Sequence, residues 1–189
     1  MIDHMTKMLL NSLAEACIGN DLPTSKGFPP VSRADARVLI LGSLPGQVSL
    51  ARVQYYAQPR NAFWPIMGLL FGAAPALPYE ERLARLTERG VALWDVCAEG
   101  RRPGSLDQKI DTASVVVNDI AGFLVTHPQT ALVCLNGGKA GDLYRRMVAP
   151  ALAASAPPSM VLPSTSPAHA AMSFDRKLEH WRAALAQSI

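Results

Sequence analysis

Four segments far apart in the chain combine glycine, proline, amide and hydroxyl groups in patterns that suit ligand binding and hydrolysis. They are Gly42-Ser43-Leu44-Pro45-Gly46, Pro59-Arg60-Asn61, Asn136-Gly137-Gly138 and Ser164-Thr165-Ser166-Pro167-Ala168-His169. Two glycines and a proline within five residues make a tight loop in which backbone N–H groups can face a ligand. Tyr55 and Tyr56 lie between the first two segments. Aromatic rings beside an arginine and an asparagine predict a pocket for a flat, uncharged ring next to a phosphate.

The apolar pattern of the chain predicts the scaffold for these segments. Short aliphatic and β-branched runs predict strands at 37–42, 91–96, 131–135 and 160–162. Helices are predicted at 62–71, 79–89, 114–126, 138–149 and 172–187, with a long loop at 98–111. This alternation predicts a three-layer α/β/α fold with a central four-stranded parallel sheet. Such sheets bind ligands outside the carboxyl ends of their strands, so we expect the four segments to meet in one crevice.

Length and composition bound the class of protein. The 189 residues are 49% hydrophobic and 17% charged, which is typical of a globular chain. We expect one domain spanning 1–189, with an N-terminal helix and a wrapping loop in 1–36 and the core in 37–189. No apolar run approaches the roughly 20 residues that a membrane helix needs. The net charge of +3 is compatible with a nucleic-acid partner without requiring one.

The N-terminus and the cysteines bear on location and cofactors. Charges scattered through the first twenty residues do not fit a secretory signal. Their apolar residues recur at helical spacing and predict an amphipathic helix: Met5, Met8, Leu9, Leu13 and Cys17. Cys17, Cys97 and Cys134 lie far apart, with no C-x-x-C pair, which argues against a zinc or iron–sulfur site and fits a reducing compartment. We expect a cytoplasmic monomer.

Taken in chain order, the segments resemble the motifs of the uracil-DNA glycosylase superfamily. GSLPG has the G-x-x-P-G form of the first motif, and PRNAFW is similar to the N-x-F-W segment of the mismatch-specific and thymine-DNA branches. CLNGGKA follows the third strand, and LPSTSPAHA is similar to the P-S-S-S-type final loop. The combination of GSLPG, YYAQPRNAFW and LPSTSPAH is most similar to the hypoxanthine-DNA (deoxyinosine) glycosylase branch. The resemblance covers about residues 36–185.

The resemblance implies a DNA repair enzyme that excises a deaminated base, hypoxanthine or uracil or both. The nucleotide is flipped out of the duplex and its N-glycosidic bond is hydrolysed. The sugar passes through an oxocarbenium-like state, so the enzyme must position a water, stabilise positive charge on the sugar and accept negative charge on the leaving base. DNA carrying a deaminated base is then the partner, and no metal or cofactor is required.

Two positions depart from the superfamily pattern. The water-positioning Asn or Asp of the first motif is replaced by Leu44, or by Gln47 if the match is shifted, and the histidine that begins the last motif of the uracil-specific branch is replaced by Leu162. In the hypoxanthine branch the missing role falls to the asparagine of the PRN segment. The candidate catalytic residues are therefore Asn61 and Ser43. Asn61 could orient the attacking water or cap the helix that starts at Ala62, and the sequence leaves both open.

The remaining candidates divide between a base pocket and a DNA-binding surface. Tyr56 and Phe63 could sandwich the flipped base, with only one of the two adjacent tyrosines facing the site. The Asn136 amide could pair with a base edge or merely occupy a turn. The full base-pocket set is Gly42, Leu44, Tyr56, Phe63 and Asn136. The DNA-binding set is Pro45, Gly46, Arg60, Lys139, Ser164, Thr165, Ser166, Pro167, Ala168 and His169.

Charged residues outside these sets have several possible roles. Asp95, at a strand end, could act as a base, stabilise the oxocarbenium ion, cap a helix or form a salt bridge. Arg60, Lys139 and the Arg101/Arg102 pair could form a phosphate-facing rim or remain solvated.

Three other classes compete with a glycosylase. A hydrolase using Ser164 or Ser166 with His169 lacks the G-x-S-x-G elbow. A nucleotide- or flavin-binding module lacks both G-x-G-x-x-G and G-x-x-x-x-G-K-[ST]. A DNA-binding protein of the same fold without catalysis is the third class, because the two usual catalytic side chains are missing.

Overall fold

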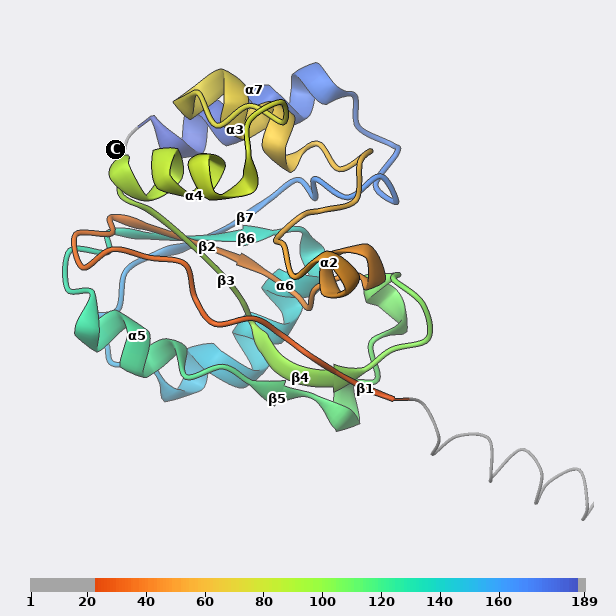
Figure 1. Ribbon diagram of the computed structural model, residues 1–189. Helices are drawn as coiled ribbons and strands as arrows, with labels where there is room; N and C mark the ends of the chain where they lie inside the picture. Colours follow the sequence, from red (N-terminus) through yellow and green to blue (C-terminus); the bar gives the residue numbers. More distant parts are fainter. Residues whose placement is uncertain (1–22, 187–189) are drawn as a thin grey trace, which may run out of the picture.

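A central parallel sheet lies between two layers of helices in the computed structural model, which describes residues 23–186 (Figure 1). The sheet has the strand order β3-β2-β6-β7. These strands are β3 Val91–Asp95, β2 Val38–Gly42, β6 Leu132–Asn136 and β7 Ser159–Leu162. The predicted three-layer α/β/α fold with four parallel strands is confirmed. The predicted N-terminal amphipathic helix lies outside the described residues.

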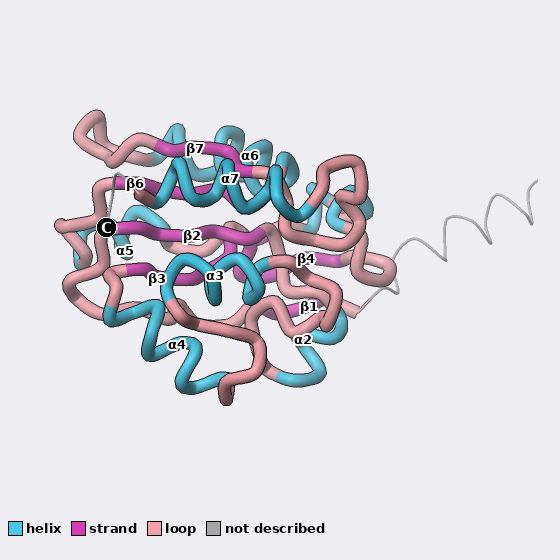
Figure 2. The backbone as a smooth tube through the Cα atoms, turned by 90° about the horizontal axis from the view of Figure 1, so that it is seen from above, coloured by secondary structure: helices cyan, strands magenta, loops and turns pink. Residues whose placement is uncertain are grey.

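Helices cover both faces of the sheet, as Figures 1 and 2 show. One face carries α3 Phe63–Phe71, α4 Tyr79–Glu88 and α7 Phe174–Leu185, and the other carries α5 Ile120–Thr126 and α6 Gly138–Leu143. Alternate residues of the central strand β2 therefore enter different cores. Val38 and Ile40 pack in the cluster that contains Trp181, and Leu39 and Leu41 pack in the cluster that contains Phe123. Burial on both faces explains why β2 is apolar without alternation.

A second, smaller sheet replaces part of the predicted long loop. It is antiparallel, in the order β1-β4-β5, from β1 Thr24–Lys26, β4 Cys97–Arg101 and β5 Val116–Val117. Residues 97–101 are thus a strand although the sequence predicts a loop there. Their sequence, CAEGR, has neither the alternation nor the β-branched residues that would reveal a strand. Pairing with β1 and β5 therefore decides their conformation.

Three helical segments differ from the sequence predictions. Helix α2, Gln47–Arg52, is not predicted, because it is only six residues long and follows a glycine–proline loop. The helix predicted at 114–126 begins only at Ile120, where the Asp119 side chain accepts a hydrogen bond from the Gly122 backbone N–H at 2.8 Å. The helix predicted at 138–149 consists of three parts. The α-helix α6 ends at Leu143, and a π-helical turn, Tyr144–Val148, and a 3₁₀ turn, Ala149–Ala151, follow it.

The ends of the other helices are close to the predicted bounds. Gly90 follows α4 with a φ of 74°, as a glycine that ends a helix should. Ser173 caps α7 by accepting from the Arg176 backbone N–H at 3.4 Å. Within the described part of the chain, no helix is long and apolar enough to cross a membrane.

Candidate active site

The carboxyl ends of the parallel strands place four residues in one row across the sheet. Gly42 of β2 pairs with Asp95 of β3, and Asn136 of β6 pairs with Leu162 of β7. Asn136 is level with Gly42, because Leu41 pairs with Leu135 one residue earlier. The loops that follow these strands leave the sheet on the same side, as the strand order requires.

A cavity of about 130 Å³ lies above this row. All four predicted segments contribute to it, so the expected crevice is present. Its lining is Gly42–Gly46, Ser49, Tyr55, Tyr56, Gln58, Asn61, Asp95, Ser105, Asp107, Asn136 and Ser164–Pro167. The cavity is smaller than the roughly 300–1,000 Å³ that is usual for larger ligands, which favours a single small ring.

The loop 42–46 is fixed from below and from the side. Its backbone accepts hydrogen bonds from the next strand-end segment: Val96 N–H donates to Gly42 O at 2.9 Å and Cys97 N–H donates to Ser43 O at 3.0 Å. A β-carbon on Gly42 would lie 2.3 Å from Asp95 Oδ1 and 3.3 Å from the Tyr56 hydroxyl. Only glycine fits here, because any side chain would displace these two groups.

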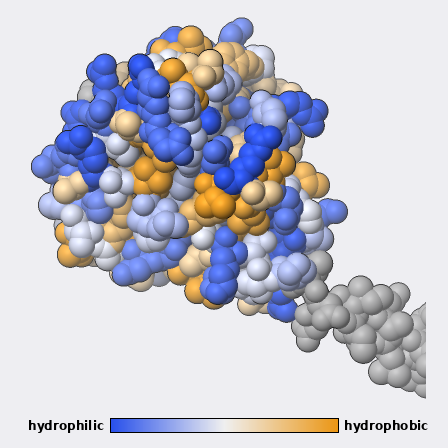
Figure 3. Space-filling model, in the orientation of Figure 1, coloured by the Kyte–Doolittle hydropathy of each residue, from blue (hydrophilic) through white to orange (hydrophobic). Residues whose placement is uncertain are grey.

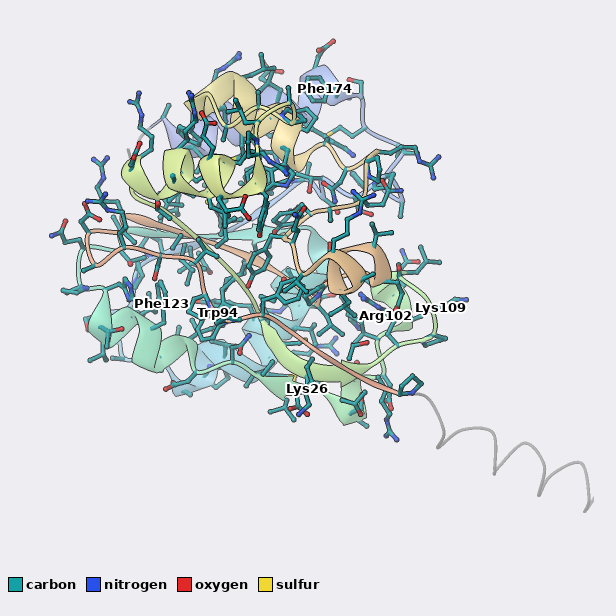
Figure 4. All side chains as sticks on the ribbon, in the orientation of Figure 1. Lys26, Trp94, Arg102, Lys109, Phe123 and Phe174 are labelled. Atoms are coloured by element: carbon teal, nitrogen blue, oxygen red, sulfur yellow. The ribbon has the colours of Figure 1, made fainter. Side chains whose placement is uncertain are left out.

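Arg102 holds the same loop from the side and is not part of a phosphate-facing rim. Its side chain is fully buried and pairs with Asp107 Oδ1 at 3.0 Å. It also donates to the backbone carbonyls of Leu44 at 3.2 Å and Pro45 at 2.5 Å. Figure 4 shows Arg102 beneath helix α2, inside the loop that follows β4. The proposed rim role for Arg102 is therefore wrong, and the residue positions the loop instead.

The aromatic side chains do not form the expected sandwich. The rings of Tyr56 and Phe63 stack directly on each other, 3.9 Å apart at an interplanar angle of 21°, so no base can enter between them. Phe63 is fully buried and does not line the cavity; it packs edge-on against Trp181. Phe63 supports Tyr56 from behind, and the prediction that it contacts the base is wrong.

Both adjacent tyrosines line the cavity, although the sequence predicts only one. The reason is the backbone of Tyr56, which has a φ of 55°, so the segment is not extended and its side chains do not alternate. The Tyr55 hydroxyl donates to Pro29 O at 3.1 Å. The Tyr56 hydroxyl is buried without a hydrogen-bond partner among the described residues. Burial raises the pKa of Tyr56 and the Asp95 carboxyl adds to this rise, whereas the neighbouring Asn136 side chain opposes it.

Asn61 lines the cavity and also stabilises the start of α3. Its Oδ1 accepts a hydrogen bond from the Phe63 backbone N–H at 3.0 Å. The helix begins one residue later than predicted, and its N-cap is Ala62 with no side-chain cap, so Asn61 steadies the first turn without being the N-cap. This contact does not exclude the catalytic role, because the amide Nδ2 and a second Oδ1 lone pair remain. The next residue ties this segment to the last loop, since Ala62 N–H donates to Thr165 O at 2.9 Å.

The side-chain amide of Asn136 is hydrogen-bonded to the last loop. It donates to Thr165 Oγ1 and accepts from the Thr165 backbone N–H, both at 2.9 Å. Thr165 is 1% exposed, so the structure does not place its hydroxyl where a phosphate could reach it. This pair holds Ser164 and Ser166 at the cavity, and one Nδ2 hydrogen of Asn136 remains for a ligand.

A groove of about 280 Å³ adjoins the cavity and shares Ser105, Asp107, Ser164 and Ser166 with it. It contains three predicted DNA-binding residues that do not line the cavity itself: Lys139, Ala168 and His169. Lys177 of α7 supports the loop from beneath, because its Nζ donates to His169 O at 2.8 Å. Arg60 is exposed and lines neither hollow. In the view of Figure 3, hydrophilic residues cover much of the visible face, with hydrophobic patches between them.

Asp95 is a buried carboxyl on the wall of the cavity. It is 4% exposed, forms no ion pair within residues 23–186, and its Oδ2 has no hydrogen-bond partner there. Burial raises the pKa of Asp95 to about 8; the nearby Asp107 carboxyl adds to the rise and Arg102 opposes it. The capping and salt-bridge interpretations of Asp95 are therefore wrong.

Four further lining residues are missing from the sequence predictions: Ser49, Gln58, Ser105 and Asp107. Ser49 belongs to the unpredicted helix α2, and its hydroxyl accepts from the Ala57 N–H at 3.2 Å. Ser105 Oγ accepts from the Gln47 N–H at 3.0 Å, which brings the loop after β4 against the start of α2. The turn Pro103-Gly104 was the only local signal for this approach. Among residues 23–186, no three His, Cys, Asp or Glu side chains lie close enough together to hold a metal ion.

A polar cavity at the carboxyl edge of a parallel sheet, closed by glycine- and serine-rich loops, is where an α/β protein of this kind binds its ligand, and its volume suits one small ring. The chain belongs to the Uracil DNA glycosylase superfamily, whose sequence profile matches residues 29–187. The family predicted from the four motifs is thus confirmed, and the unrelated hydrolase and nucleotide-module alternatives lose their support.

The chain is also similar to two named relatives and to one solved structure. The chain is 38% identical over 159 residues to a protein of Methanosarcina acetivorans named hypoxanthine DNA glycosylase, covering 84% of this chain and 96% of the relative. It is 38% identical over 122 residues to a protein of the same name from Methanosarcina barkeri, covering 62% and 73%. The solution NMR structure of a putative uracil DNA glycosylase from M. acetivorans is similar at a TM-score of 0.71 and 35% identity, covering 85% of this chain and 96% of that one.

Proposed function

We propose that this protein is a DNA repair glycosylase that hydrolyses the N-glycosidic bond of hypoxanthine flipped out of DNA. The convergence of four loops on one small cavity, with Asn61 on its wall, carries the proposal. The relatives named hypoxanthine DNA glycosylase support this choice of base. Hypoxanthine carries a ring carbonyl next to a ring N–H. Uracil and xanthine have the same pair of groups, so these bases are the alternatives that an assay must include.

Each part of the cavity has a task in such a reaction. Asn61 orients the attacking water through the hydrogen-bonding capacity that capping leaves free. Tyr56, stacked on Phe63, supplies a rigid wall for the base. The loop 42–46 brings backbone N–H groups close to the leaving base, where they stabilise the negative charge that develops. Ser43 of this loop lines the cavity, which suits a role at the sugar.

The groove next to the cavity suits the DNA backbone on either side of the flipped nucleotide. Lys139 and His169 line it together with Ser164 and Ser166, and hydroxyl and cationic groups position phosphates without sequence preference. Pro167 and Ala168 belong to the same loop, and their role in this proposal is to enter the space that the flipped nucleotide leaves. Monomeric state and cytoplasmic location stay predictions from the sequence.

A base-release assay tests the function. Purified protein is incubated with labelled duplexes that carry inosine, uracil or xanthine, in the presence of EDTA, and abasic sites are then cleaved with alkali. We expect cleavage at inosine, and a loss of at least about 100-fold in Asn61→Ala, the size of effect that a positioned acid–base group contributes. Gel-shift affinity for an inosine duplex should stay within about threefold of the parent, because Asn61 contacts no phosphate in this account.

A DNA-binding protein without catalysis is the second candidate. It is favoured by Leu162 and Leu44, each 4% exposed, which occupy the positions of the missing catalytic side chains and cannot replace them chemically. Specific binding to an inosine duplex with no abasic sites at any enzyme concentration would establish this candidate and exclude the glycosylase.

A further inference from the structure

Two buried polar atoms in the cavity have no hydrogen-bond partner within residues 23–186, Asp95 Oδ2 and the Tyr56 hydroxyl. Their two side chains meet beside Gly42, because a β-carbon on Gly42 would lie 2.3 Å from Asp95 Oδ1 and 3.3 Å from the Tyr56 hydroxyl. Buried polar groups are nearly always paired, and an unpaired one costs stability. Two such atoms at the floor of one cavity indicate that a ligand completes them.

The groups that face Asp95 do not include a cation paired with it. From the segment after β4 come Asp107 and Arg102, and Arg102 is committed to Asp107 and to backbone carbonyls. The other titratable groups that interact with Asp95 are Tyr55 and Tyr56, Tyr79 of α4, and Cys97 of β4. Burial raises the pKa of all four, that of Cys97 to about 12, so they stay neutral below pH 10.

The surroundings of Asp95 therefore favour its neutral form. A carboxylate loses its hydration when buried, and a second carboxylate nearby repels it. Both effects act here and raise the pKa of Asp95 to about 8. At neutral pH the side chain is then mostly a carboxylic acid, which can donate one hydrogen bond as well as accept others.

Building on the proposed function, we propose that Asp95 recognises the flipped base as a neutral carboxylic acid. Its O–H donates to the ring carbonyl of the base, and its C=O accepts from the adjacent ring N–H. The Tyr56 hydroxyl supplies a further donor to the same edge. The class of ligand that fits is a base with neighbouring carbonyl and N–H groups, as in hypoxanthine. Asp95 is thus a specificity-determining residue and not the general base.

An ionised Asp95 would work against the reaction in two ways. A carboxylate has no donor, so it would face the base carbonyl with a like partial charge. It would also repel the negative charge that develops on the leaving base. The neutral acid avoids both, and its hydrogen bond to the carbonyl strengthens as that charge grows.

Asparagine separates these possibilities, because its amide has the same shape, one donor side and one acceptor side, and no charge. The experiment measures single-turnover hypoxanthine release from pH 6 to pH 10 for the parent, Asp95→Asn and Asp95→Leu. Asp111→Asn is the matched control, an exposed carboxyl between β4 and β5 that is paired with Arg101 at 3.3 Å. Ionisation of the base itself affects all variants alike, so the ratio of parent to Asp95→Asn is the readout.

We expect Asp95→Asn to keep its rate within about tenfold at pH 7, and Asp95→Leu to lose more than about 100-fold. Above pH 8 the ratio of parent to Asp95→Asn should fall about tenfold per pH unit, as the neutral acid is lost. Asp111→Asn should follow the parent at every pH. An Asp95→Asn variant that melts like the parent but is as inactive as Asp95→Leu would overturn the proposal, since Asp95 would then act ionised. A ratio that stays flat to pH 10 would overturn it as well.

Equilibrium binding of free hypoxanthine over the same pH range keeps this inference separate from the proposed function. The affinity of the parent relative to that of Asp95→Asn should fall above pH 8, because ionisation of the base itself lowers the affinity of both proteins alike. Parent protein that releases no base but shows this loss would refute the glycosylase and support the role of Asp95. Base release without any pH-dependent difference between the two proteins would support the glycosylase and refute the role of Asp95.

Discussion

Replacing Arg102 by alanine tests whether a buried guanidinium fixes the loop that forms the cavity floor. The side chain of Arg102 is fully buried, and its ion pair with Asp107 is 3.0 Å long. It also donates to the carbonyls of Leu44, Pro45 and Gly104. The substitution leaves these three acceptors and one carboxylate without their partner, in a loop that the sheet alone does not hold.

The loss of folding free energy in Arg102→Ala follows from the burial of the ion pair. Removing one partner of a buried ion pair costs about 3–5 kcal/mol. The Asp107 side chain keeps 36% of its exposure, so water can solvate it in part and we expect the lower end, about 3 kcal/mol. For a chain of this size that lowers Tm by about 6–12 °C.

Urea unfolding and thermal melting measure this loss, and Arg145→Ala is the matched control. Arg145 also pairs with a carboxylate, Asp142, at 2.6 Å, but its side chain is 67% exposed, so its loss should cost less than about 1 kcal/mol. Base release should fall more in Arg102→Ala than in the control, because only Arg102 positions Leu44 and Pro45. Equal stability losses in the two variants would refute the idea that Arg102 fixes the loop.

Three further predictions concern residues at the cavity. Thr165→Val should destabilise the fold by about 1–3 kcal/mol and slow base release, because Asn136 loses a buried acceptor. Thr165→Ser keeps the hydroxyl and should do neither. Chemical unfolding measures the stability, and the base-release assay measures the rate. Gly42→Ala should nearly abolish release while the protein still folds, since the new methyl group displaces Asp95; retained activity would show that the cavity floor is not where we place it. Because the pKa of Asp95 is raised to about 8, its proton stabilises the folded state at low pH and this contribution is lost as pH rises from about 4 to 8. Asp95→Asn should therefore gain stability relative to the parent over that range in chemical unfolding, and a constant difference would contradict the raised pKa.

The sheet and the meeting of its loops are predictable from sequence for a physical reason. Parallel strands buried on both faces must be continuously apolar, as in Val38–Leu41, and their carboxyl ends must share an edge. Gly42, Asn61, Asn136 and Ser164 therefore reach one cavity from positions that span more than 100 residues of the sequence.

What sequence does not reveal is which partner a side chain finds. Phe63 and Tyr56 are both aromatic and near a strand end, and only the packing shows that one ring covers the other. Arg102 lies in a polar, glycine-rich segment where a charged residue is normally solvated, yet the fold buries it. Asp95 has no local pattern that distinguishes a carboxyl in a cavity from one in a salt bridge.

The structure of the Asn61→Ala protein bound to a duplex that contains inosine tests the central claim most directly. The account predicts that the hypoxanthine base is rotated out of the helix and lies in the cavity above Gly42, within hydrogen-bond distance of Asp95 and Tyr56. A base that remains stacked in the duplex, or that occupies another surface of the protein, would contradict it.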